Sequence, residues 1–217
     1  DCFYLNVCLC VCLCVFFRAR VNVCVFACAG AVLLGHDNYS HANLRYSSKH
    51  SAPMILESSI ADIVHQYVEL FFRSEILQMY CLKWAYLLKK LLLGYNPIDQ
   101  LHEAARKENI DLAILLPLPD DEVVGIVFNS FDFSLDHCLP CVLYLCIKYQ
   151  HSPTQAMTAS ANLGGDAANR TALVGALMGA IHGYTEIPLE WRIGLKDHEK
   201  IAVVYEQLVL QAMQMKL

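Results

Sequence analysis

The chain lacks an excess of basic residues. Its 217 residues include 16 lysines and arginines against 21 aspartates and glutamates, which gives a net charge of −5. Proteins that bind nucleic acid through its phosphates carry a basic patch or stripe, so no nucleic-acid partner is expected. Hydrophobic residues make up 56% of the chain, and its length is sufficient for one domain with its own core.

Several common functional motifs are also missing. The sequence has no Walker loop for nucleotide phosphates, no paired CxxC motifs for zinc and no G-x-S-x-G turn for a nucleophilic serine. One CxxC, from Cys138 to Cys141, encloses Pro140 in a helical pattern, and two buried thiols are expected there. With Cys81 and Cys146, these cysteines suit a reducing compartment, so the expected location is cytoplasmic.

Long uninterrupted apolar runs are missing as well, although residues 1–35 are rich in cysteine and strongly apolar. Arg18 and Arg20 interrupt this segment, leaving runs of roughly 17 and 15 residues, whereas a spanning helix needs about 20. A membrane anchor, a signal peptide and a low-complexity piece outside the fold all stay open. The alternating Val, Cys and Leu favour the third, so a membrane partner is expected only if residues 3–35 are genuine.

The remainder predicts a linker followed by a helical domain. Residues 36–60 are polar and contain a proline, as is typical of a linker. Residues 61–217 show apolar side chains at helical spacing and no strand pattern, which predicts an all-α, multi-helical single domain. The expected helices begin near Ala61, Asn96, Asp120, Asp136, Ser152, Asp166, Ile187 and residue 198.

The most specific pattern is a glycine turn that opens a helix of small residues. Gly164 and Gly165 permit backbone angles that other residues avoid, and Asp166 follows them at the expected N-cap. Such a turn brings backbone N–H groups, a carboxylate and a helix N-terminus together. It therefore suits a phosphate, a metal ion or a sugar hydroxyl.

Four polar side chains gather at this turn by their spacing: Asn162, Asp166, Asn169 and Arg170. Together they supply oxygen ligands, amide donors and one cation. Two simpler interpretations stay open, namely that Asp166 only caps its helix, or that Asp166 and Arg170 form an ordinary i,i+4 ion pair.

A second candidate is the pair Asp136-His137, which begins the helix before the glycine turn. A carboxylate beside a histidine suits acid–base chemistry. The alternative is simply an acidic residue in the first turn of a helix, where the helix dipole favours it.

Three segments together resemble the C-terminal signature of the ADP-ribosylglycohydrolases. They are Ala159–Asp166, Gly175–Ala180 and Ile187–Trp191, and the resemblance covers residues from about 60 to 215. It implies an all-α hydrolase that cleaves the glycosidic bond between ADP-ribose and a protein or small molecule. Typical members hold two magnesium ions. A non-catalytic, crystallin-like binding or structural role is the alternative.

The resemblance also assigns roles at the turn. Asp166 matches a metal-binding acid, Ala168 stands where the family usually has a second acid, and Arg170 resembles a variant branch with arginine in this turn. The Gly-Asp and Thr-Asp-Asp runs of the family's N-terminal third are not found, which suggests that this part is missing or replaced. We therefore expect one magnesium ion at most, with Arg170 contacting the pyrophosphate.

The expected site residues follow from this resemblance. The catalytic candidates are Asp166, Asp136 and His137; the substrate-binding candidates are Gly164, Gly165, Asn162, Asn169 and Arg170; the metal ligand is Asp166.

Overall fold

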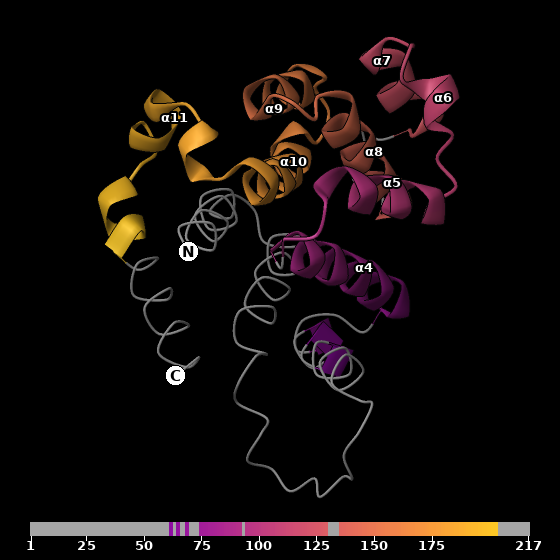
Figure 1. Cartoon of the computed structure of the whole chain (residues 1–217), viewed down its shortest axis with the longest axis horizontal. Coiled ribbons are helices and arrows are strands. Elements are labelled where there is room, and N and C mark those ends of the chain that lie inside the picture. The colour runs from indigo at the N-terminus through magenta and orange to yellow at the C-terminus, as the bar shows by residue number, and fades with distance from the viewer. Residues whose placement is uncertain are drawn as a thin grey trace, which may run out of the picture.

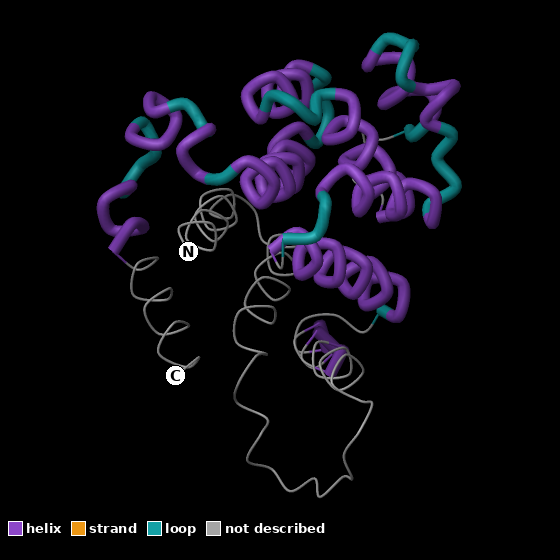
Figure 2. The backbone as a smooth tube through the Cα atoms, in the orientation of Figure 1, coloured by secondary structure: helices purple, strands orange, loops and turns teal. Residues whose placement is uncertain are grey.

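The regular structure of the protein is helical wherever it is described (Figures 1 and 2). The computed structural model describes residues 61–62, 64–65, 68–69, 74–92, 94–129 and 135–203. No strand occurs within these ranges, which confirms the all-α prediction. The predicted segments 1–35 and 36–60 lie outside the described residues. None of the described helices is both long and apolar enough to span a bilayer.

Residues 61–62, 64–65 and 68–69 are helical, and the labelled helices follow them along the chain. They are α4 (Glu75–Leu92), α5 (Pro97–Lys107), α6 (Leu112–Leu115), α7 (Asp120–Glu122), the π-helix η1 (Val123–Val127), α8 (Leu135–Lys148), α9 (Pro153–Asn162), α10 (Ala167–His182), the short η2 (Tyr184–Glu186) and α11 (Leu189–Ile193). A further helix begins at residue 198, as predicted, and the rest of its expected span lies outside the described residues.

Two predicted helix starts are confirmed by their caps. Asn96 Oδ1 accepts a hydrogen bond of 3.0 Å from the backbone N–H of Ile98, and Pro97 occupies the first helical position. Ser152 Oγ accepts from the N–H of Gln155 at 3.3 Å. Each side chain satisfies an N–H group that the helix itself leaves without a partner.

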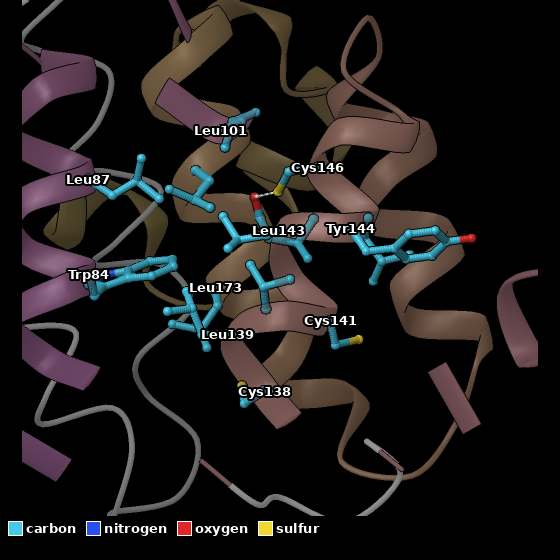
Figure 3. Close-up of a cluster of buried hydrophobic side chains, with 14 of the residues drawn as sticks. Trp84, Leu87, Leu101, Cys138, Leu139, Cys141, Leu143, Tyr144, Cys146 and Leu173 are labelled. Carbon is cyan, nitrogen blue, oxygen red and sulfur yellow. Dashed lines mark hydrogen bonds between the residues drawn. The ribbon is translucent and has the colours of Figure 1, made fainter. Parts of the chain in front are cut away.

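The core is built around α8 and α10. Residues 141–147 of α8 are all at most 3% exposed, and residues 172–180 of α10 are buried as well. Figure 3 shows Leu139 and Leu143 of α8 among side chains from α4, α5 and α10, whereas Tyr144 of the same helix points away from them. Because these helices are covered on several sides, apolar burial along them is the main force that holds the bundle together.

The two thiols of the CxxC lie inside this core. Cys138 is 5% and Cys141 0% exposed, as expected from the sequence. Both belong to α8, which continues through Pro140.

The segment before α8 differs from the prediction. Sequence spacing predicts a helix through residues 120–128, whereas the structure has the short α7 followed by the π-helix η1. Sequence reasoning also missed α6, whose first turn is capped by Asp111 Oδ1 through the N–H of Ala113 at 3.2 Å. Three- and four-residue helices carry too few periodic positions to be detected.

Candidate functional site at the glycine turn

The glycine turn joins α9 to α10 in a few residues. Helix α9 ends at Asn162, Gly164 and Gly165 have φ angles of +72° and +60°, and Asp166 is the N-cap of α10. Two successive residues in the left-handed region reverse the chain sharply. Residues that carry a Cβ rarely adopt these backbone angles, whereas glycine does so easily. The predicted conformational role of the two glycines is therefore confirmed.

The carboxylate of Asp166 does not cap its helix. Among the described residues it accepts no backbone N–H from the first turn of α10. Instead, Asn169 Nδ2 donates to both Asp166 Oδ1 and Oδ2 at 2.8 Å. The simple capping interpretation is wrong for this side chain, because Asn169 holds the carboxylate beside the turn.

Arg170 lies behind the turn, on its buried side. The side chain is 1% exposed, and its Nη2 donates to the carbonyl oxygens of Ser160 at 2.9 Å and Gly164 at 2.7 Å. Next to it, Thr171 Oγ1 donates to Ser160 Oγ at 2.8 Å. The expected pyrophosphate contact of Arg170 stays a prediction, while these contacts tie the turn to the end of α9.

The outer face of the turn is open. Asn162, Gly164 and Gly165 are exposed, whereas Asp166 and Asn169 are half-buried. A Cβ placed on Gly164 would meet no atom within 4 Å. A ligand can therefore approach the backbone and the Asp166 carboxylate from this side.

The N-terminal ends of α8 and α10 lie close together. Cys146 Sγ lies 4.0 Å from the carbonyl oxygen of Val174 (Figure 3). Eight residues before this contact, the chain of α8 is at Cys138 and the chain of α10 is at Asp166. Burial raises the pKa of Cys138, the neighbouring Cys141 and the charge of Asp166 raise it further, and Arg170 opposes them. Asp166 and Arg170, at the start of α10, therefore lie near Cys138 in the first turn of α8.

The Asp136-His137 pair belongs to this start of α8. Asp136 occupies the first turn of the helix, and His137 is half-buried. Within the described part of the chain, His137 Nδ1 is buried without a hydrogen-bond partner. The fold therefore brings a histidine with unused hydrogen-bonding capacity to the same end of the bundle as Asp166.

The described donors do not fit a two-magnesium site. In these ranges no group of three or more His, Cys, Asp or Glu side chains is arranged to hold a metal ion. Asp166 supplies one carboxylate, and both of its oxygens accept from an amide. Magnesium prefers oxygen ligands in near-octahedral geometry, usually with one or two carboxylates. The expected single magnesium ion stays a prediction.

Sequence reasoning missed a polar cluster around Asp120. Its carboxylate accepts from Tyr144 at 2.9 Å, from Tyr149 at 2.5 Å and from Lys148 at 2.7 Å. Burial alone would raise the pKa of Asp120, but the hydrogen bonds from Lys148, Tyr149 and Tyr144 outweigh it and lower this pKa. The i,i+4 spacing of Tyr144 and Lys148 in the sequence indicates that the two side chains share one face of a helix. It does not reveal Asp120, their partner, because that residue belongs to a different helix.

A hollow of about 390 Å³ lies between α4 and α5, and none of its lining residues belongs to the glycine turn. Its charged residues pair with one another. Lys83 lies 2.6 Å from Glu108, while Lys90 and Lys107 lie 3.1 Å and 2.7 Å from Glu103. The lysines are therefore largely neutralised by glutamates, and the glycine turn is the better candidate for an anionic ligand.

Comparison with known proteins gives one family. A sequence model described as ADP-ribosylglycohydrolase matches residues 26–216, which include both the glycine turn and α8. The match begins inside the predicted low-complexity segment, about 35 residues before the start expected from the motifs. That segment's separation from the fold stays a prediction. No curated protein matches the chain.

Proposed function

The chain belongs to the ADP-ribosylglycohydrolase family, and from this premise we propose that its glycine turn binds an ADP-ribosyl group whose glycosidic bond it hydrolyses. The observation that most supports this proposal is the carboxylate of Asp166. It stands at the N-terminus of α10 without capping the helix and lies beside two exposed glycines. The proposed substrates are ADP-ribosylated proteins or small molecules, in the cytoplasm.

The chemistry of the bond assigns a role to each group. A glycosidic bond breaks through an oxocarbenium-like state, so positive charge must be stabilised, the leaving group protonated and a water activated. The Asp166 carboxylate is suited to the charge and the water, and His137 to the proton. Asn169 fixes the orientation of the carboxylate.

The backbone is suited to the anionic part of the ligand. The N-terminus of α10 favours negative charge, and N–H groups of a glycine turn can approach a pyrophosphate without obstruction by side chains. Asn162, Gly164 and Gly165 would contact the ligand on this face. We also propose at most one magnesium ion, with Asp166 as its ligand.

A second function is a non-catalytic, crystallin-like binding or structural role. Two observations favour it: the amide of Asn169 engages both oxygens of Asp166, and Ala168 stands where the family usually has a second acid. A turn of this kind would still bind an ADP-ribosyl group while lacking the groups that cleave it.

An ADP-ribose release assay separates the two functions. N- and O-linked ADP-ribosyl peptides are incubated with wild type, Asp166→Ala and Asp121→Ala, with and without magnesium. Asp121 is an exposed acid of α7 and serves as the matched control. We expect release by wild type and by Asp121→Ala, and a loss of about 100-fold or more in Asp166→Ala.

The other outcomes of this assay are also informative. Equal release by wild type and Asp166→Ala would remove Asp166 from the mechanism. Absence of release with retained ADP-ribose binding would select the non-catalytic function, and absence of both would contradict the proposal.

A further inference from the structure

We propose that Arg170 is a positioning residue, which fixes the glycine turn from its buried side and so aims the turn at its ligand. The ligand half of this inference rests on the proposed function. The structural half, that Arg170 orders the turn, does not. Arg170 would thereby act through the backbone of Gly164, whereas the expectation from the sequence is a direct contact with the pyrophosphate.

The guanidinium group of Arg170 lies at the C-terminal end of α9. Ser160 is two residues from the last residue of that helix, so its carbonyl is one of the four that an α-helix leaves without an internal partner. Arg170 Nη2 donates to this oxygen at 2.9 Å. A cation at a helix C-terminus is also favoured by the helix dipole, so Arg170 stabilises the end of α9 in two ways.

The same nitrogen atom holds the first glycine of the turn. Arg170 Nη2 donates to the carbonyl oxygen of Gly164 at 2.7 Å, which is shorter than the 3.5 Å contact from Gly164 N to Ala161 O. Two adjacent glycines have large conformational freedom, and ordering them costs free energy. A short, charge-assisted hydrogen bond is well suited to restrict the peptide that joins them.

A second connection supports the first. Thr171 Oγ1 donates to Ser160 Oγ at 2.8 Å, and Ser160 is 0% exposed. Arg170 and Thr171 are the fourth and fifth residues of α10, so both tie the start of this helix to the end of α9. The network orders the turn from inside and leaves its outer face open.

The arrangement connects the buried side of the turn to its open side. Asp166 and Arg170 lie four residues apart, one helical turn. Because Arg170 holds Gly164 and belongs to the same helical turn as Asp166, a change at Arg170 would displace the carboxylate relative to the glycine N–H groups. Loss of that alignment weakens ligand binding even when the helix stays folded.

The test compares Arg170→Met and Arg170→Lys with a matched control. Leu177→Ala is the control, because Leu177 is fully buried in α10 about two turns beyond the site. Each variant is examined by thermal unfolding, by calorimetric titration with ADP-ribose and by ¹⁵N relaxation of the Gly164 and Gly165 amides.

We expect Arg170→Met and Leu177→Ala both to lower the melting temperature, but only Arg170→Met to change the turn. In that variant the ADP-ribose affinity falls about tenfold or more and the two glycine amides become more mobile. Arg170→Lys recovers part of the affinity and part of the glycine order, because an ammonium group can still donate to one carbonyl. Thr171→Val, a milder change, shifts both readouts in the same direction by less.

Three results would overturn the inference. The first is glycine mobility in Arg170→Met equal to that in Leu177→Ala. The second is an equal loss of affinity in both Arg170 variants with the glycines still ordered, which would indicate direct contact with the ligand. The third is unchanged affinity in Arg170→Met beside mobile glycines. Failure of wild type to bind ADP-ribose would instead refute the proposed function, and the relaxation data would still decide whether Arg170 orders the turn.

Discussion

Asp120 and Asp166 both stand at the start of a helix, yet their carboxylates have different surroundings. Asp120 accepts hydrogen bonds from Tyr144, Tyr149 and Lys148, which are supplied by or directly follow α8. Within the described part of the chain, Asp166 is held by the single amide of Asn169. The first acid is enclosed by its protein, and the second faces an open turn.

The difference separates a structural acid from a candidate site acid. A carboxylate offers about four lone-pair positions, and the strong donors around Asp120 leave little capacity for a ligand. Asp166 keeps some of that capacity, beside exposed glycines and a helix N-terminus. A lowered pKa therefore does not by itself identify a site, because the Asp120 carboxylate has one and is already occupied by donors of the protein.

The largest expected effect on stability comes from Asp120→Ala. This change leaves Lys148 and two tyrosine hydroxyls without their acceptor, and we expect it to lower the free energy of unfolding by about 3 kcal/mol. Urea unfolding measures the change, with the exposed neighbour Asp121→Ala as control at about 0.5 kcal/mol or less. If both variants lose the same small amount of unfolding free energy, Asp120 has no special structural role, and the contrast between Asp120 and Asp166 fails.

The same cluster predicts a pH dependence. The folded-state pKa of Asp120 is lowered, so its contribution is complete above the unfolded-state pKa of about 4 and is lost as the pH falls through the folded-state value. The difference in unfolding free energy between wild type and Asp120→Asn should therefore be constant near neutral pH and shrink below about pH 4. If this free-energy difference persists unchanged in strong acid, the ionised form of Asp120 is not what stabilises the fold.

Asn169→Ala tests Asp166, the acid at the open turn, and here we expect a larger effect on ligand binding than on stability. Asn169 is half-exposed and donates to Asp166 through its Nδ2 atom alone, so its removal should cost about 1 kcal/mol or less in unfolding free energy. Because the carboxylate of Asp166 then loses its fixed orientation, we expect ADP-ribose affinity to fall about fivefold. Calorimetric titration measures this, and an unchanged affinity would mean that Asn169 does not orient the site.

The smallest effect is expected from Glu103→Gln on α5. Hydrogen bonds from Lys107 and Lys90 hold the pKa of Glu103 at about 2, yet its side chain is 35% exposed. Exposed pairs of this kind contribute about 0–1 kcal/mol and are screened by salt. Chemical unfolding at low and high ionic strength checks this, and a loss as large as that of Asp120→Ala would show that enclosure is not the deciding factor.

Local chemistry made much of the fold predictable. Asn96 and Ser152 mark helix starts because their side chains bond to the adjacent backbone, and Gly164-Gly165 marks a turn because only glycine adopts those angles easily. The family resemblance rests on the same local features and is confirmed by the family match.

The burial of Arg170 and the partners of Asp120 could not be predicted in this way. Asp120 meets tyrosines that lie 24 and 29 residues further along the chain. The depth of Arg170 depends on how closely α9 packs on α10, and nothing in its immediate sequence distinguishes a buried guanidinium from one that contacts a ligand. Both features arise from tertiary packing, which overrides local preference.

We propose that the turn around Asp166 binds an ADP-ribosyl group. A calorimetric titration of ADP-ribose into wild type, Asp166→Ala and the control Asp121→Ala, all without added magnesium, tests this binding. We predict one binding site in wild type and in the control, and an affinity lower by about tenfold or more in Asp166→Ala. Equal binding by all three proteins, or binding by none, would contradict the claim.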